Sequence, residues 1–191
     1  MIRPEMLSPF WPRKPLGEVV EFLDHLRRPV TAKDRAPGPY PYYGANGQQD
    51  SVAEHLFDEP LVLLAEDGGY FGDPERTIAY KVDGKCWVNN HAHVLRPKDD
   101  VDINFLCYQI EKYDVTPFIN GATRQKLTKS SASEIPIALP PLSEQKRIAA
   151  ILDKADAIRR KRQQAIKLAG DFLRATFLDM FGDPVTNSKL W

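Results

Sequence analysis

Residues 120–127, Asn-Gly-Ala-Thr-Arg-Gln-Lys-Leu, present amide, hydroxyl and cationic side chains and have almost no apolar residues among them. An arginine can bind guanine through two hydrogen bonds, a glutamine can bind adenine in the same way, and a lysine can bind guanine or a phosphate. The segment therefore predicts a surface that reads base edges and contacts phosphates. The candidate contact residues are Thr123, Arg124, Gln125 and Lys126 in this segment and Lys129 just after it. The simpler alternative is an ordinary charged loop.

Two further segments carry polar side chains of related kinds. The amides around residue 47 can pair with adenine, and the acids after residue 65 can accept hydrogen bonds from cytosine amino groups. Glycines in the second segment allow a backbone shape that brings an aromatic ring against DNA. The candidates are Asn46, Gln48 and Gln49 in the first segment and Glu66, Asp67, Gly69 and Tyr70 in the second. In each segment the alternative is a solvated turn with no ligand.

Residues 89–93, Asn-Asn-His-Ala-His, predict a polar strand face. Side chains alternate along a strand, so Asn89, His91 and His93 would share one face and add to the contact residues. The two histidines are a weak zinc signal, because no third or fourth ligand is evident, and we expect no metal. Alternatively, these side chains organise neighbouring loops through hydrogen bonds.

The elements that must position these groups follow from local patterns. Residues 61–65 predict a buried strand that is followed by an exposed loop, and residues 104–113 predict a helix. Residues 77–82 and 86–95 predict a hairpin around the turn Asp83-Gly84. Residues 31–50 are rich in glycine and proline and predict a loop, and residues 135–142 predict a short strand ended by prolines. Together they indicate an α/β (α+β) domain with a mixed sheet.

The most regular expected element is a helix that begins with Ser143 as its N-cap and ends near residue 180. Its apolar residues recur at spacings of three and four, which is typical of a coiled coil. At 1.5 Å per residue, roughly 38 residues extend about 57 Å, farther than one small domain can cover. A helix from a second chain is therefore expected along this stripe, and the alternative is a helix that folds back on its own domain. The stripe residues are Ile148, Ile151, Ala155, Ile158, Ala165, Ala169, Phe172 and Thr176, and Arg162 fills the one remaining position at this spacing.

The composition, with 191 residues of which 42% are hydrophobic and 27% charged, is that of a soluble globular protein. No apolar run approaches the roughly 20 residues of a membrane span, and a cytoplasmic location is expected. Cys86 and Cys107 are expected to be reduced core thiols. Residues 1–141 have 16 Lys and Arg against 20 Asp and Glu, whereas residues 142–191 have 10 against 6. This balance predicts weak affinity of the chain alone for DNA.

Several motifs resemble, in order, the specificity (S) subunits of type I restriction-modification enzymes. The strongest is Gly-x-x-Arg-Gln-Lys-Leu at 121–127, which is followed by Ile-Pro-Ile-Ala-Leu-Pro-Pro-Leu-Ser-Glu-Gln at 135–145. Other segments are similar to the opening of a target recognition domain, its first loop, its central strand and the link to a second such domain. They lie at 16–22, 40–47, 87–95 and 181–187.

The resemblance implies a compact mixed-sheet target recognition domain at 1–141 and a long coiled-coil dimerisation or spacer helix at 142–181. Residues 182–191 would be a linker or the truncated start of a second recognition domain. Because a full S subunit carries two of each part, we expect a half subunit, and it stays open whether this half is natural or the front of a longer protein.

The same resemblance implies three kinds of partner. These are double-stranded DNA, a modification (M) subunit that binds S-adenosylmethionine, and a restriction (R) subunit. A homodimer through antiparallel helices would read a palindromic, split target, since a two-fold protein reads a two-fold site.

The sequence contains no Gly-x-Gly-x-x-Gly, no P-loop and no Asn-Pro-Pro-aromatic motif, so a non-catalytic chain without its own cofactor is expected. Two other classes stay open. A metal-dependent nuclease would need Glu66, Asp67, His91 and His93 to converge on one ion. A coiled-coil scaffold would bind a protein partner and have no role on DNA.

Overall fold

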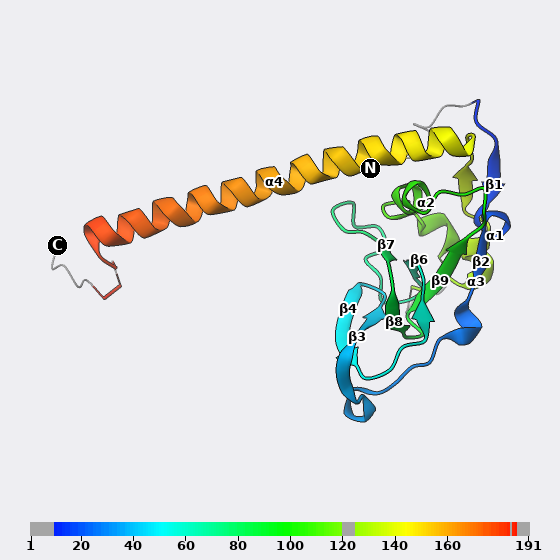
Figure 1. Cartoon of the computed structure of the whole chain (residues 1–191), viewed down its shortest axis with the longest axis horizontal. Helices are drawn as coiled ribbons and strands as arrows, with labels where there is room; N and C mark the ends of the chain where they lie inside the picture. Colours follow the sequence, from blue (N-terminus) through cyan, green and yellow to red (C-terminus); the bar gives the residue numbers. More distant parts are fainter. Residues whose placement is uncertain (1–9, 120–124, 184, 187–191) are drawn as a thin grey trace. The chain divides into compact units, whose positions relative to one another are not determined.

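The computed structural model describes residues 10–119, 125–183 and 185–186 (Figure 1). The contacts within the chain divide it into two units, Met1–Ala149 and Ala150–Trp191. The first unit contains two four-stranded sheets, a two-stranded pair and short helices, and the second contains most of a long helix. The expected α/β class with a long C-terminal helix is confirmed.

The central sheet of the first unit has the strand order β2-β9-β6-β7, and all neighbouring strands are antiparallel. Its strands are β2 (Val20–Phe22), β6 (Leu61–Ala65), β7 (Ala79–Val82) and β9 (Ala92–Pro97). Every residue of β6 is buried, as its continuous apolar run predicts. Leu61 and Leu63 lie in one hydrophobic cluster, whereas Val62 and Leu64 lie in the other. The sheet is therefore covered on both faces.

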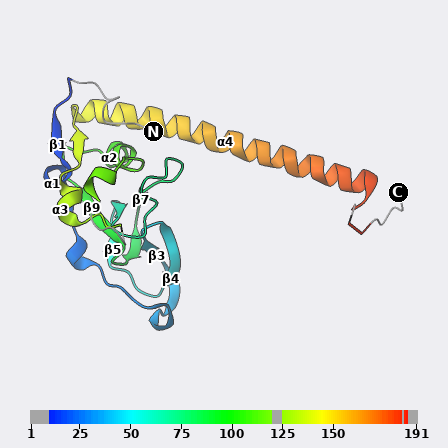
Figure 2. The same ribbon diagram turned by 180° about the vertical axis from the view of Figure 1, so that it is seen from behind.

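The second sheet has the order β4-β3-β8-β5 and is mixed, because β3 and β8 are parallel and the other neighbours are antiparallel. Its strands are β3 (Pro37–Gly44), β4 (Gly47–Val52), β5 (Phe57–Asp58) and β8 (Lys85–Val88). Cys86 and Val88 share a hydrophobic cluster with Leu63 and Val94 of the central sheet, so the two sheets pack on each other. Figures 1 and 2 show β3 and β4 across the central sheet from helix α2 (Ile103–Ile110).

Short helices cover the other face of the central sheet. They are α1 (Leu16–Val19), α2 and α3 (Lys129–Ser133), and single 3-10 turns lie at Asp24–Leu26, Ala32–Asp34 and Thr116–Phe118. The sequence predicted α2 close to its observed position, because its apolar residues follow the helical period. Asp102 caps it by accepting a hydrogen bond from the backbone N–H of Phe105 (2.9 Å).

A buried amide ties the segment before the long helix to α2. Strand β10 (Pro136–Ala138) pairs antiparallel with β1 (Arg13–Pro15). Gln109, which is 3% exposed, donates from Nε2 to the carbonyl oxygen of Ala138 (3.0 Å) and accepts at Oε1 from its N–H (2.9 Å). The side chain thus makes the two backbone hydrogen bonds of Ala138 that a second strand, on the side of β10 away from β1, would otherwise make.

The long helix α4 (Leu142–Phe181) begins one residue before Ser143, the expected N-cap. The carbonyl oxygen of Pro141 accepts from the N–H groups of Glu144 (2.8 Å) and Gln145 (3.1 Å), so the first turn starts at the proline. Of the predicted stripe, Ile148 and Thr176 are half-buried, and the following are exposed: Ile151, Ala155, Ile158, Ala165, Ala169 and Phe172. Within the described ranges, no helix is both long and apolar enough to cross a membrane.

The expectation of a loop over residues 31–50 is wrong, because most of this segment forms β3 and β4. Pro37, Pro39 and Pro41 lie two residues apart along β3. Backbone N–H groups alternate between the two edges of a strand, so the missing N–H groups all fall on the same edge. The parallel partner β8 pairs only beyond these prolines, at Tyr42 and Tyr43. The spacing of the prolines, rather than their number, decides that a strand can form.

The predicted hairpin of residues 77–82 and 86–95 is also wrong. Gly84 occupies a turn with φ of 70°, but β7 pairs with β6 whereas β8 pairs with β3 and β5. The turn therefore carries the chain from one sheet to the other. The second predicted strand is in fact β8 and β9, separated by a turn at residues 89–91. Consequently, Asn89 and His91 do not share a strand face with His93.

Candidate nucleic-acid interface

Three segments that the sequence analysis selected separately lie side by side in the first unit. The β3–β4 turn is held to the loop after β6 by Asn46, whose Nδ2 donates to the carbonyl oxygen of Gly68 (2.8 Å). On the same loop, Asp67 forms an antiparallel bridge with Lys126, and the N–H of Leu127 donates to the carbonyl oxygen of residue 66 (2.8 Å). Several of the predicted contact residues, Asn46, Asp67 and Lys126 among them, therefore lie on or beside the loop that follows β6.

Glu66 is an anchor of this loop rather than an exposed acceptor, which corrects the expectation of an exposed loop directly after β6. It is 8% exposed, and its carboxylate lies 2.6 Å from Nη1 of Arg27 and 2.8 Å from Nζ of Lys126. Burial alone would raise the pKa of Glu66. The hydrogen bonds from Lys126 and Arg27, with the charges of His93 and Arg27, outweigh burial and hold the pKa below its ordinary value.

His93 lies at the centre of these charges and is completely buried. Its Nδ1 is 2.6 Å from Oδ2 of Asp24, and its Nε2 is 2.8 Å from the carbonyl oxygen of Leu127. Both ring nitrogens face oxygen atoms, so each contact requires a proton. Burial alone would raise the pKa of Asp24, but hydrogen bonds from His93 and the Val94 N–H, together with nearby positive charge, lower it. We call these residues the buried charge network: Asp24, Arg27, Glu66, His93 and Lys126, of which only Lys126 has an exposed side chain (46%).

His91 and Asp67 form a second, more exposed pair, in which Nδ1 of His91 contacts Oδ1 of Asp67. The His91 side chain is 40% exposed, whereas that of Asp67 is 11% exposed. The backbone N–H of His91 donates to Oδ1 of Asn89 (2.8 Å), and Nδ2 of Asn89 donates to Oε1 of Gln49 (3.2 Å). Asn89 thus organises the turn and the neighbouring strand, while the ring of His91 reaches the surface.

The residue types of a metal site occur within the buried charge network. Among the described residues, one ligand atom each of Asp24, Glu66 and His93 lies within 4.8 Å of the others. Cations of the chain already pair with the carboxylate of Glu66, and both ring nitrogens of His93 contact oxygen. A metal ion would have to displace these contacts. The four residues of the nuclease alternative are divided between this network and the His91–Asp67 pair.

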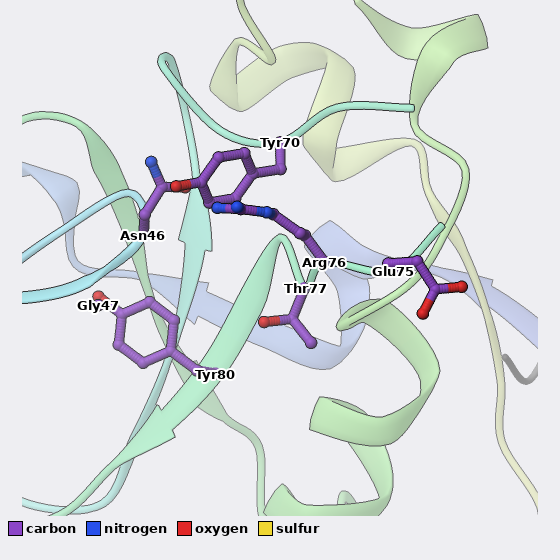
Figure 3. A pocket seen from close by; sticks show the side chains of 7 residues that line it. All are labelled: Asn46, Gly47, Tyr70, Glu75, Arg76, Thr77 and Tyr80. Atoms are coloured by element: carbon purple, nitrogen blue, oxygen red, sulfur yellow. The ribbon is translucent and has the colours of Figure 1, made fainter. Parts of the chain in front are cut away.

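An open pocket of about 470 Å³ lies beside the β3–β4 turn (Figure 3). The guanidinium of Arg76 lies over the ring of Tyr70, with Cζ 4.0 Å from the ring centroid. The hydroxyl of Tyr80 donates to the carbonyl oxygen of Gly44 (2.5 Å), and burial raises the pKa of Tyr80, so this phenol stays a donor. The lining residues are Asn46, Gly47, Tyr70, Glu75, Arg76, Thr77 and Tyr80.

Other predicted contact residues have separate local roles. Gln48 and Gln49 are exposed on β4, and Nε2 of Gln48 donates to the carbonyl oxygen of Asp50 and to Oγ of Ser51 (both 3.1 Å). Gly69 allows a close approach, because a Cβ there would lie 2.6 Å from Cβ of Ala65.

The segment expected to carry the main contacts is described only in part. Thr123 and Arg124 lie outside the described residues, and Gln125 is exposed beside Lys126. Lys129 begins α3 rather than lying in a loop, and its Nζ is 5.4 Å from the centroid of the Phe22 ring.

The sequence analysis missed Asp24, Arg27 and Arg76. Asp24 lies 69 residues from His93 in the chain, so no local spacing links them. Arg27 is likewise 39 residues from Glu66. Arg76 did have a local signal, since it follows Tyr70 within the same loop rich in glycine and acids.

Comparisons with known proteins identify the family of this chain. The family model described as type I restriction modification DNA specificity domain matches residues 10–168. The chain belongs to this family. Two curated relatives are type I restriction enzyme specificity subunits. S.HindORF215P of Haemophilus influenzae is 41% identical over 145 residues, which cover 76% of this chain and 37% of the relative. EcoprrI of Escherichia coli is 24% identical over 149 residues, covering 76% and 36%.

Solved structures from type I restriction-modification systems share the fold. The S subunit of a type I restriction-modification system from M. genitalium has a TM-score of 0.62 at 16% identity, covering 95% of this chain and 52% of that one. A chain from a study of complex assembly and conformational transition of the type I R-M system also has a TM-score of 0.62, at 22% identity, covering 91% and 46%. The specificity-domain chain thus spans little more than a third of the length of the curated relatives it matches.

Proposed function

We propose that this chain is the DNA sequence-recognition part of a type I restriction-modification specificity subunit. It reads one half of a bipartite target in double-stranded DNA and directs an M subunit and an R subunit to that target in the cytoplasm. It has no catalytic activity and no cofactor of its own, and S-adenosylmethionine binds to the M subunit. The observation that supports this proposal is the family match over residues 10–168, which includes the gathered loops and most of α4.

The exposed side chains around the loop after β6 are the proposed readers. Asn46, Tyr70 and Gln125 are exposed, and the ring of His91 is half-exposed. Amides, phenols and imidazoles can each bond to base edges or phosphates. Glu66, in contrast, is held by cations of the chain, so its proposed contribution is to hold the loop in place.

The chain is further proposed to form a homodimer through α4. The side chains of Ile151, Ile158 and Phe172 are 52%, 58% and 69% exposed. A helix with exposed apolar residues at coiled-coil spacing gains stability when a second helix covers them. Antiparallel pairing would give a two-fold protein for a split palindrome, with half-sites separated by one to two turns of duplex, each about 34–36 Å.

Light scattering on the purified chain tests this pairing. We expect a dimer that Ile158→Glu and Phe172→Glu each dissociate, because a buried charge at a helix seam is costly. Phe177→Glu is the matched control, since Phe177 is 51% exposed but lies outside the predicted stripe. A monomeric wild-type chain would contradict the homodimer.

Footprinting of the chain assembled with its M subunit tests DNA recognition. Two protected patches on one duplex are expected, and one contiguous patch would contradict the split target. The nuclease alternative predicts plasmid cleavage by the pure chain with Mg²⁺ or Mn²⁺. The scaffold alternative predicts that replacing Arg124 and Gln125 with alanine leaves all binding unchanged.

A further inference from the structure

The arginines of the first unit differ in how closely their guanidinium groups pair with carboxylates. Arg27 and Arg96 each bond to carboxylates at 2.7 Å or less, and Arg35 bonds to Asp50 at 3.1 Å. Arg76 has only a long ion contact, from Nε to Asp73 at 3.8 Å, between side chains that are 54% and 43% exposed. Among the described residues, its two terminal nitrogens have no hydrogen-bond partner. These donors are therefore available to a ligand.

Tyr70 orients this guanidinium without using its donors. The cation lies over the face of the ring, whereas the N–H groups lie in the guanidinium plane, where the contact with the ring does not occupy them. Figure 3 shows the head groups of Tyr70 and Arg76 near Asn46, while the carboxylate of Glu75 lies away from them. The contact with the ring already restricts the Arg76 side chain before a ligand binds. Less conformational entropy is then lost on binding, so the donors are preorganised.

Asn46 places an acceptor beside these donors. Its Nδ2 donates to the carbonyl oxygen of Gly68, which fixes the amide, and no described residue of the chain donates a hydrogen bond to Oδ1. Guanine presents two acceptors in the major groove, O6 and N7, and its partner cytosine presents the N4 amino donor. Donors on Arg76 beside an acceptor on Asn46 therefore match a G·C pair. A phosphate, which has only acceptors, does not need Oδ1.

We propose that Arg76 is a specificity-determining residue that reads a guanine in the major groove. Tyr70 is its positioning residue, and Oδ1 of Asn46 accepts from the cytosine of the same pair. The inference rests on the proposed function and deepens it, because it assigns one base pair of the target to one pocket.

The test selects duplexes from a randomised library with the full chain assembled with its M subunit. The wild-type chain is expected to enrich one motif, and Arg76→Ala is expected to lose the G·C preference at one position, by about 10- to 100-fold. Arg147→Ala is the control for the loss of one charge, because Arg147 is exposed and pairs with Glu144 in the first turn of α4. It should keep the motif.

Two further measurements separate base reading from a general electrostatic effect. Replacing the assigned guanine with 7-deazaguanine removes N7 and should weaken binding by the wild type but not by Arg76→Ala. Tyr70→Phe keeps the stack and should keep the preference, whereas Tyr70→Ala should weaken it.

The outcomes that overturn the inference are distinct from failure of the proposed function. If Arg76→Ala binds all sequences equally less tightly and with a shallower salt dependence, Arg76 contacts a phosphate instead. If the variant enriches the wild-type motif unchanged, Arg76 reads nothing. A wild-type assembly that enriches no motif would overturn the proposed function itself, and the inference would fall with it.

Discussion

Gln145 joins the first turn of α4 to the rest of the first unit through a single buried amide. Its side chain is 1% exposed. Oε1 accepts from the N–H of Asp102 (2.9 Å), and Nε2 donates to the carbonyl oxygens of Asp100 (3.0 Å) and Pro140 (2.9 Å). The glutamine that ends the motif Pro-Pro-Leu-Ser-Glu-Gln therefore has a structural role in this chain, between the turn before α2 and the start of the long helix.

The expected cost of removing this amide follows from its three hydrogen bonds. Each contributes a net 0.5–1.5 kcal/mol, so Gln145→Ala should lower the free energy of unfolding by about 3 kcal/mol. Gln145→Met keeps most of the side-chain volume and should cost a similar amount, because the polar groups of three segments lose their partner. Gln145→Glu should cost at least as much, since it directs an oxygen at two carbonyl oxygens.

Urea denaturation followed by tryptophan fluorescence measures this loss, because Trp87 lies in β8 of the first unit. Gln163→Ala is the control, as Gln163 is exposed on α4 and should change the free energy of unfolding by less than about 0.5 kcal/mol. If Gln145→Ala costs less than about 1 kcal/mol, the amide does not hold the first turn of α4, and the reasoning from its contacts is refuted.

Three other perturbations have defined outcomes. Folding lowers the pKa values of Asp24 and Glu66 below 3.8 and 4.5, so their stabilising contribution is complete above these values and is lost as the pH falls through the lower folded-state values. Urea midpoints should therefore decline below about pH 4, and Glu66→Gln should make the decline shallower; equal slopes would contradict the network. Leu63→Ala, at a completely buried position between the sheets, should cost about 3–4 kcal/mol, and a cost under 1 kcal/mol would show that the core is not closed there. Gly84→Ala must adopt φ of 70° and should lower the free energy of unfolding by about 1 kcal/mol. Gly170→Ala meets nothing within 4 Å on α4 and should raise helix stability by about 1 kcal/mol; the same sign for both glycines would refute the argument.

The parts of the fold that the sequence predicted are those with a local cause. Strand β6 and helices α2 and α4 each follow from a pattern among neighbouring residues, and all three are observed. The coiled-coil pairing of α4 stays a prediction. The β3 strand was missed because the prediction weighed the glycine and proline content of the segment and not the alternate spacing of its prolines. The partners of β7 and β8 could not be predicted, since a strong local turn at Gly84 says nothing of which distant strand each one joins.

In the candidate site, too, the sequence predicted residue types and did not predict contacts between residues that are distant in the chain. The sequence identified the polar types at Asn46, Tyr70 and Lys126, but only the fold brings them to one loop. Glu66 was interpreted as an exposed acceptor because its partner Arg27 is distant in the chain and close in space. An acid at the end of a buried strand is thus ambiguous until its counter-ions are known.

In the loop after β6, the residues that fix the backbone lie at the start, and the proposed base-reading residues lie farther along. Glu66 and Asp67, at its start, are each 8% exposed, whereas Tyr70 is 38% exposed and the Arg76 side chain 54%. Because ion pairs and a backbone bridge fix the start, side chains farther along can be exchanged without removing these ion pairs or this bridge. Changes at Tyr70 and Arg76 should therefore alter which bases are read and leave stability nearly unchanged. Changes at Glu66 should lower stability and disturb every contact of the loop together, since a buried cation left without its carboxylate is costly.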